Sequence, residues 1–126
     1  MANPTVTPLV EQWHDGGFLV SQANGHRSVD QAVLAAGAKV YAGTIVGKIT
    51  ASGKFVQCVS TASDGSQVPA GILFGTKDAT LADKPCVVVR RDCEVNTTEL
   101  IWDASFNAGA ITTGLATLAG LGIIGR

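Results

Sequence analysis

Charged residues are scarce in this sequence. Only 15% of its 126 residues are Asp, Glu, Lys or Arg, whereas an ordinary soluble domain has about 25%. The nine Lys and Arg are scattered, and Arg90 and Arg91 are their one adjacent pair. Nucleic-acid binding needs clustered cations that displace counterions from phosphates, so we expect no nucleic-acid partner. A surface so poor in charge favours a protein that works within an assembly, although an ordinary neutral domain can share this feature.

Cysteine is also scarce, with three residues at positions 58, 86 and 93 and no CxxC pair. An odd number without close pairs argues against a disulfide framework and against a zinc site. Free cysteine packs well in protein cores, so we expect all three to be buried. The first fifteen residues lack the basic and apolar regions of a secretory signal. These features predict synthesis in a reducing compartment.

Catalytic and cofactor-binding motifs are nearly absent. The segment GLGIIG at 120–125 has dinucleotide-binding glycine spacing, but only Arg126 follows it, so the helix that should hold the pyrophosphate is missing. His14 and His26 are the two histidines, without the spacing of a metal site. We therefore expect no enzyme and no catalytic, cofactor-binding or metal-binding residue. A hydrolase whose triad assembles across the fold stays open as an alternative.

The longest uncharged segment is residues 104–125, and its 22 residues could cross a bilayer. However, it contains five Gly, three Thr, one Ser and one Asn, and it has no sustained run of Leu, Ile and Phe. Close packing of small residues against other protein explains this composition better, so we expect no membrane partner.

The N-terminal segment differs from the rest of the chain. Pro4 and Pro8 favour extended backbone in their neighbours, and no turn lets the β-forming residues between them pair locally. Asp15-Gly16-Gly17 then ends the segment. We predict an extended N-terminal arm at residues 1–17 and a body at residues 18–126. An edge strand packed on its own domain is the alternative for the arm.

The body shows the pattern of short strands separated by glycines. Predicted strands cover residues 18–22, 54–60, 72–74, 86–90 and 122–124, with further strands around 40–46. Turns are predicted at Asn24-Gly25 and at 63–66, where Asp64 and Gly65 have suitable side chains. Alternation from Val87 onward places the apolar side chains of positions 87, 89, 93 and 95 on one face.

Two segments have helical features. Ser28 and Gln31 fit a helix capping box, so residues 28–36 could be a helix or a strand. Ile111, Leu115 and Leu118 lie at helical spacing and predict one short C-terminal helix within 104–119, weakened by Gly109 and Gly114. The predicted fold class is therefore mainly β with little helix: a compact, small β-barrel-like body, one short C-terminal helix and an extended N-terminal arm.

The order of short motifs carries a family resemblance. The motifs are AGTIVGK at 42–48, SGKF at 52–55, DGS at 64–66, PAGIL at 69–73, DAT at 78–80, VVVR at 87–90, EVN at 94–96 and ELIW at 99–102. This ordered series resembles the head decoration proteins of lambda-type tailed bacteriophages over about residues 26–126.

The resemblance implies a β-tulip body and favours a strand at 28–36. It also implies a homotrimer at the threefold sites of an expanded capsid, where the protein stabilises the head against the pressure of internal DNA. The partners would be the major capsid protein of a tailed phage and two further copies of the chain. The protein would lie on the outer surface of the virion after synthesis in the host bacterial cytoplasm.

The resemblance gives the arm its role by position only, since its residues match no family motif, and it implies an arm that is poorly ordered in the free protein and becomes ordered on the shell. The arm would bind the capsid, and its anchor candidates are Pro4, Val6, Leu9, Val10 and Trp13. Asp64, Gly65 and Trp102 are candidates for a trimer or capsid contact, although the turn at 63–66 and the strand after it are expected mainly to shape the body. The alternative is a small β-barrel module that binds carbohydrate or peptide on an aromatic platform of Trp13 and Trp102.

Overall fold

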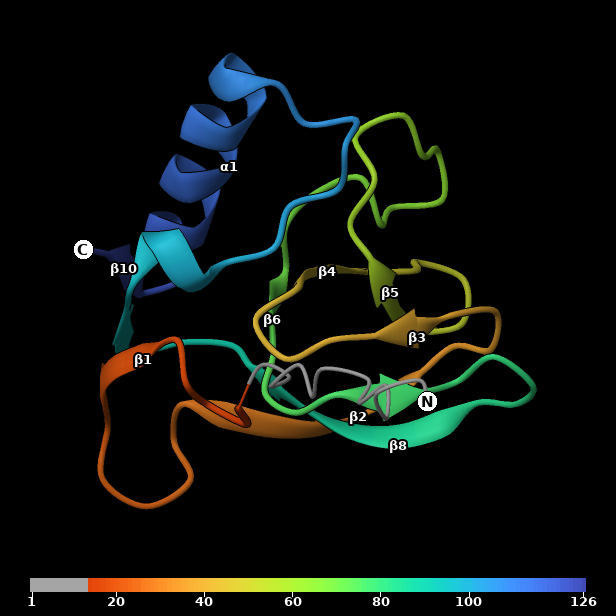
Figure 1. Cartoon of the computed structure of the whole chain (residues 1–126), viewed down its shortest axis with the longest axis horizontal. Coiled ribbons are helices and arrows are strands. Elements are labelled where there is room, and N and C mark those ends of the chain that lie inside the picture. Colours follow the sequence, from red (N-terminus) through yellow and green to blue (C-terminus); the bar gives the residue numbers. More distant parts are fainter. Residues whose placement is uncertain (1–13) are drawn as a thin grey trace, which may run out of the picture.

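The structure is a computed structural model, and it describes residues 14–126. Its strands are β1 (Leu19–Gln22), β2 (Val29–Leu34), β3 (Lys39–Val40), β4 (Ile45–Lys48), β5 (Phe55–Gln57), β6 (Gly71–Leu73), β7 (Lys77–Asp78), β8 (Lys84–Val89), β9 (Cys93–Val95) and β10 (Ile123–Gly125). A 3-10 helix at Thr97–Glu99 and one α-helix, α1 (Ala108–Gly120), complete the secondary structure of the described residues. The prediction of a mainly β protein with a single short C-terminal helix is confirmed (Figure 1).

Five strands close into a barrel in the order β2-β5-β4-β6-β8. The longest pairing joins β2 to β8, antiparallel from Val29 opposite Val89 to Leu34 opposite Lys84. β3 and β7 form a separate two-stranded sheet, and β1, β9 and β10 form a three-stranded sheet in which β10 runs parallel to β9. The predicted barrel-like body is thus a closed barrel with two small sheets attached.

The barrel strands contain adjacent apolar residues because both faces of the barrel wall are covered. Side chains alternate between the two faces of a strand. Accordingly, in β4, β6 and β8 one residue of each apolar pair points into the barrel and the other points outward. The inward cluster, here called the barrel core, comprises Leu34, Val40, Val46, Phe55, Leu73, Ala79, Cys86 and Val88.

The outward-pointing residues build a second cluster, here called the outer core. Its members are Phe18, Ile45, Cys58, Ile72, Val89, Cys93, Val95, Leu118 and Ile123. It lies between the barrel wall and a second layer formed by α1 and the three-stranded sheet, on the left of Figure 1. Residues from the C-terminal fifth of the chain therefore complete a core that the barrel begins.

Within residues 28–36 the structure has a strand, β2 at Val29–Leu34, as the resemblance favours, and no helix. Ser28, the residue that would begin a capping box, precedes β2 and is buried. Its Oγ accepts a hydrogen bond from the Ala23 N–H at 2.9 Å and donates one to the Asp92 carbonyl at 2.9 Å. The hydroxyl therefore joins the β1–β2 loop to the β8–β9 loop instead of capping a helix.

The prediction that the side chains of positions 87, 89, 93 and 95 share one face holds for three of the four. Val89, Cys93 and Val95 lie together in the outer core, but Val87 is half-buried outside that cluster. Asp92, between β8 and β9, has a φ of 53°, which changes the direction of the chain. Cys86 and Val88 are buried on the opposite face, since β8 is a wall of the closed barrel.

All three cysteines are buried and free, as predicted. The turn predicted at Asn24-Gly25 is present, with a φ of 67° at Gly25, although β1 and β2 do not pair with one another. None of the helices among residues 14–126 has the length and hydrophobicity that a bilayer-spanning helix needs.

Candidate interaction surfaces

The predicted anchor residues of the arm lie outside the described residues. These are Pro4, Val6, Leu9, Val10 and Trp13. Residues 14–17, the end of the predicted arm, form a turn against the body. The Gly16 N–H donates to the Phe74 carbonyl at 2.9 Å, and the Gly17 N–H donates to the His14 carbonyl at 3.0 Å. The boundary between arm and body at residue 17 stays a prediction.

Asp64 and Gly65 form a rigid turn at the surface of the barrel. Oδ1 of Asp64 accepts hydrogen bonds from the Ser66 N–H and hydroxyl, and these contacts lower the pKa of Asp64. Gly65 has a φ of 101°, a backbone conformation that favours glycine. The turn packs so closely on β4 that a Cβ at Gly47 would lie 2.0 Å from the Ser66 carbonyl oxygen. These are the contacts of a turn that shapes the body, and a partner contact by Asp64 or Gly65 stays a prediction.

Trp102 joins the barrel to the helix. Its indole lies against α1 at Gly114, where an added Cβ would be 2.6 Å from the ring. The Phe106 ring centroid is 5.1 Å from that of Trp102. The half-buried indole therefore takes part in internal packing beside the outer core. A partner contact by Trp102 remains a prediction, as does its place in an aromatic platform.

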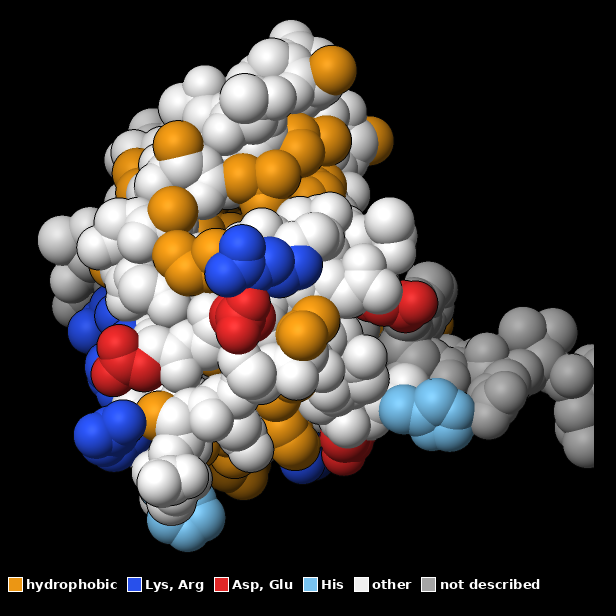
Figure 2. Space-filling model, turned by 90° about the vertical axis from the view of Figure 1, so that its left-hand side faces the viewer, with side chains coloured by type: hydrophobic (Ala, Val, Ile, Leu, Met, Phe, Trp, Pro, Cys, Tyr) orange, Lys and Arg blue, Asp and Glu red, His pale blue; other side chains and the backbone are white. Residues whose placement is uncertain are grey.

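The exposed side of α1 carries no charge. Figure 2 shows hydrophobic side chains gathered in the upper half of this view, with the charged side chains below them. Three threonine hydroxyls of α1 donate to the carbonyls four residues earlier: Thr112 to Ala108, Thr113 to Gly109 and Thr117 to Thr113. Since these hydroxyls are satisfied within the helix, the helix offers few polar groups to a partner.

A well-anchored loop exposes one leucine that the sequence analysis did not identify. Leu81, between β7 and β8, is 96% exposed. The loop is held by Asp78, which accepts from the Thr80 N–H and hydroxyl, and by Asp83, which accepts from the Ala36 N–H and pairs with Lys54. An apolar side chain on a preorganised loop loses little conformational entropy when it binds. Leu81 is the one large apolar residue in the polar run KDATLADK, and this pattern was the signal in the sequence that could have indicated its exposure.

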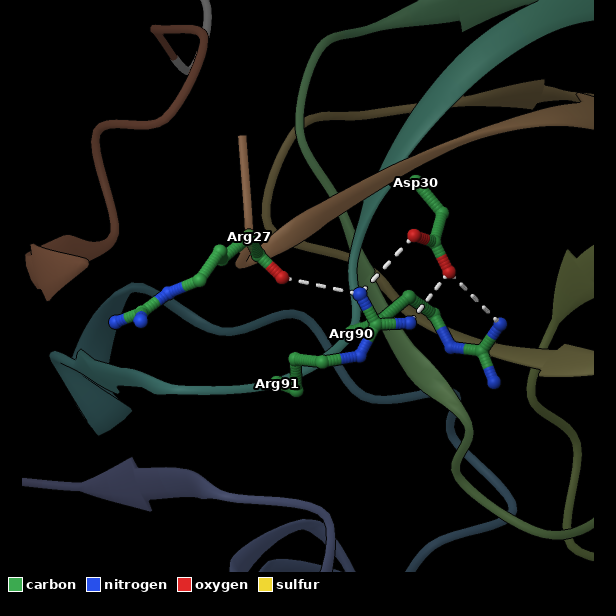
Figure 3. Close-up of polar contacts among 4 residues, drawn as sticks. All are labelled: Arg27, Asp30, Arg90 and Arg91. Carbon is green, nitrogen blue, oxygen red and sulfur yellow. Dashed lines mark hydrogen bonds and ion pairs between the residues drawn. The ribbon is translucent and has the colours of Figure 1, made fainter. Parts of the chain in front are cut away.

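Asp30 lies among arginines where β2 meets the end of β8 (Figure 3). Arg91 donates to both carboxylate oxygens, at 3.0 and 2.6 Å, and to the Arg27 carbonyl at 3.0 Å. Arg90 lies 3.6 Å from the same carboxylate and 5.3 Å from the centroid of the Phe55 ring. The Arg91 hydrogen bond is the main cause of the lowered pKa of Asp30. The cluster ties two strands together and leaves this part of the surface with net positive charge.

Within residues 14–126, no group of three or more His, Cys, Asp or Glu side chains could hold a metal ion. The surfaces described above are instead suited to contacts with protein: a charge-free helix face, an exposed leucine on a rigid loop and a basic cluster.

Comparisons with known proteins agree with a role in contacts between proteins. A search of curated proteins finds no match. The family model described as bacteriophage lambda head decoration protein D matches residues 8–123, from the second half of the predicted arm into β10. Because the match covers most of the chain, this protein belongs to the family of bacteriophage head decoration proteins, structural components of the virion capsid.

Proposed function

We propose that this protein is a capsid cement protein that binds as a homotrimer at the threefold sites of an expanded phage head. There it holds neighbouring capsid subunits together from outside against the pressure of packaged DNA. The observation that carries the proposal is the family match over residues 8–123. The low charge of the sequence and the charge-free face of α1 are consistent with a surface that works in contact with other protein.

The predicted arm at residues 1–17 is the proposed capsid-binding element. In this mechanism it adds as an extended strand to an exposed sheet edge of the major capsid protein. Main-chain hydrogen bonds would contribute to affinity, and alternate side chains would contribute to selectivity. Val6, Leu9, Val10 and Trp13 are the proposed apolar anchors, and Pro4 favours extended backbone around it.

Three arms on one trimer would act together. Once one arm has bound, the second and third bind at a high effective concentration, which can raise the overall affinity by about 10²–10⁴. A ligand that binds only the assembled shell stabilises it by about 2.7 kcal/mol per site at a concentration of about 100 Kd. Repeated over many threefold sites, this linkage would oppose rupture without covalent chemistry.

Purified protein mixed with expanded and unexpanded shells tests the proposal. We expect co-sedimentation with expanded shells, weak or absent binding to unexpanded shells, and a light-scattering mass of three chains for the free protein. Deletion of residues 2–13 should abolish shell binding and leave the mass of three chains unchanged, because the turn at residues 14–17 and the body stay intact.

A variant with residues 2–13 replaced by a Gly/Ser segment of equal length is the matched control for chain length, and we expect it to bind shells no better than the deletion. Unchanged shell affinity after deletion would show that the arm is not the binding element. A clean monomer at micromolar concentration would contradict the trimer.

A further inference from the structure

The loop between β1 and β2 carries an Asn-Gly pair on the surface of the body. Asn24 and Gly25 are both exposed, as are His26 and Arg27 after them. The loop projects from the body at the lower left of Figure 1. Because β1 and β2 do not pair with one another, this turn lies outside any β-ladder.

The two groups of this pair that can react with each other have no partner among the described residues. They are the side-chain carboxamide of Asn24 and the main-chain nitrogen of Gly25. Within residues 14–126, no hydrogen bond holds either group. A Cβ built on Gly25 would meet no atom of this part of the chain within 4 Å, so the space around the nitrogen is open. Glycine also changes its backbone conformation at little steric cost. The nitrogen can therefore approach the carboxamide carbon.

Asn96 is protected from the same approach on both sides. Its carboxamide oxygen accepts hydrogen bonds from the Thr98 N–H at 3.1 Å and from the Thr98 hydroxyl at 2.7 Å. The Thr97 N–H, which would have to attack, donates to the Arg126 carbonyl at 3.3 Å. Both reacting groups are thus held in hydrogen bonds that must break before a ring can form.

The remaining asparagines are protected in other ways. The carboxamide oxygen of Asn107 accepts from the Ala110 N–H at 2.8 Å, where it caps the start of α1. Asn3 precedes Pro4, whose main-chain nitrogen carries no hydrogen. Asn24 therefore differs from the other asparagines in the sequence, because it combines a free carboxamide with an unhindered neighbouring nitrogen.

We propose that Asn24 is a site of spontaneous deamidation in the folded protein and the asparagine that reacts first. The main-chain nitrogen of Gly25 forms a bond to Cγ of Asn24, and the carboxamide nitrogen leaves as ammonia together with the amide proton. Water then opens the resulting succinimide ring at either of its carbonyls, which gives aspartate or isoaspartate. Over the whole reaction, each asparagine consumes one water and releases one ammonia, and no enzyme or oxidant is needed.

The fold tolerates the product because the loop is pinned before the modified residue. Isoaspartate lengthens the main chain by a methylene group. The Ala23 N–H donates to the Asp92 carbonyl at 3.1 Å and to Oγ of the buried Ser28 at 2.9 Å. The added length therefore stays within exposed residues 24–27, away from both apolar clusters. The new carboxylate makes the formal net charge, −1 in the unmodified chain, one unit more negative.

Ageing of the purified protein at pH 8 and 37 °C tests the proposal. Peptide mapping by mass spectrometry, with methyl labelling by an isoaspartyl methyltransferase, follows each asparagine. We expect conversion of Asn24 at least about tenfold faster than that of Asn96 and Asn107, a ratio that corresponds to about 1.4 kcal/mol of activation free energy. The rate at Asn24 should fall at pH 6, because fewer main-chain amides lose their proton.

Asn24→Gln is the matched control, because the same carboxamide on a longer side chain closes its ring much more slowly. It should remove the fast conversion and leave the rates at Asn96 and Asn107 unchanged. In the urea-unfolded chain these two asparagines lose their hydrogen bonds, so their rates should rise relative to that of Asn24. An intact Asn24 in native protein, after the unfolded chain has reacted, would overturn the proposal, as would earlier conversion of Asn96 or Asn107.

Anion-exchange chromatography separates the more negative product from the unreacted protein. We expect the product to keep the light-scattering mass and the melting temperature of the fresh protein, since the altered residue lies outside both clusters. A lower melting temperature would overturn the placement of the change in the exposed loop alone. None of these measurements uses capsid shells, so this proposal and the proposed function can fail separately.

Discussion

At the scale of single residues, each cysteine lies in one of the two apolar clusters. Cys58 and Cys93 belong to the outer core and Cys86 to the barrel core. Burial disfavours the charged thiolate, and it raises the pKa of Cys58 and Cys93 to about 11, with smaller contributions from the charges of Asp103 and Asp92. Burial also raises the pKa of Cys86. Reactivity of a thiol depends on its thiolate form and on access, and both are suppressed here.

We therefore expect none of the three cysteines to react with Ellman's reagent in the native protein at pH 8. After unfolding in urea, all three thiols should react at the rate of a free cysteine. A single fast-reacting thiol in the native protein would show that one of these sites opens or is exposed.

At the scale of elements, α1 is attached to the barrel through a close contact. Asn107 begins the helix by accepting a hydrogen bond from the Ala110 N–H at 2.8 Å. Leu118 lies in the outer core, and Gly114 lies against Trp102. Gly114 is unfavourable for an isolated helix, as the sequence analysis notes. In the folded protein its missing side chain is the space that the indole occupies.

Two identical substitutions in α1 should have different effects. Gly114→Ala should destabilise the protein by about 1–3 kcal/mol, because the added Cβ overpacks against Trp102. Gly109→Ala should be neutral or stabilise by up to about 0.5–1 kcal/mol, because its Cβ would meet only Asn107 Oδ1 at 3.5 Å and alanine favours the helix. Urea denaturation midpoints measure both, and equal shifts would contradict the packing described for Trp102.

At the scale of the whole molecule, ionisable groups limit the pH range of stability on both sides. Hydrogen bonds and cations lower the pKa of six described carboxylates, those of Asp30, Asp64, Asp78, Asp83, Glu94 and Asp103. A group with a lowered pKa stabilises the fold above its unfolded pKa, and this contribution is lost as the pH falls through the folded pKa. The buried thiols have raised pKa values, so their contribution is lost as the pH rises from 9 towards 11.

The melting temperature should consequently be level near neutral pH, fall below about pH 4 and fall again above pH 9. Calorimetry between pH 2.5 and 10.5 measures both limbs. Asp30→Asn should make the acid limb shallower, because one lowered pKa is removed, and Cys93→Ala should do the same on the alkaline side. If the dependence of the melting temperature on pH is unchanged in these variants, other ionisable groups cause it.

Many elements could be predicted from local patterns. Adjacent apolar residues such as Ile72-Leu73 marked the barrel strands, and the spacing of Ile111, Leu115 and Leu118 marked α1. Asp64 and Gly65 carried the turn chemistry that the structure contains. The ambiguity at Ser28 could not be resolved locally, because its hydroxyl can cap a helix or join two loops, and the partner Asp92 is 64 residues away.

The candidate surfaces were less predictable than the strands. Leu81 stands alone in a polar run, which indicates its exposure, whereas nothing in the immediate neighbours of Val33 indicates that it faces solvent. Val33 and Val87 share the outer face of the barrel wall because β2 pairs with β8, whose paired residues are fifty to sixty positions apart in the sequence. Alternation shows which residues share a face, but it does not show what covers that face.

The sequence alone determined the β-rich class, the short C-terminal helix, the buried free cysteines and the family, because each depends on composition, short periodicity or the order of local motifs. Tertiary structure alone decided that the barrel closes, that β10 pairs with β9, that Trp102 lies on Gly114 and that Gly16 lies against Phe74. The physical reason is that these features depend on contacts between distant segments, which a local pattern permits without specifying the partner.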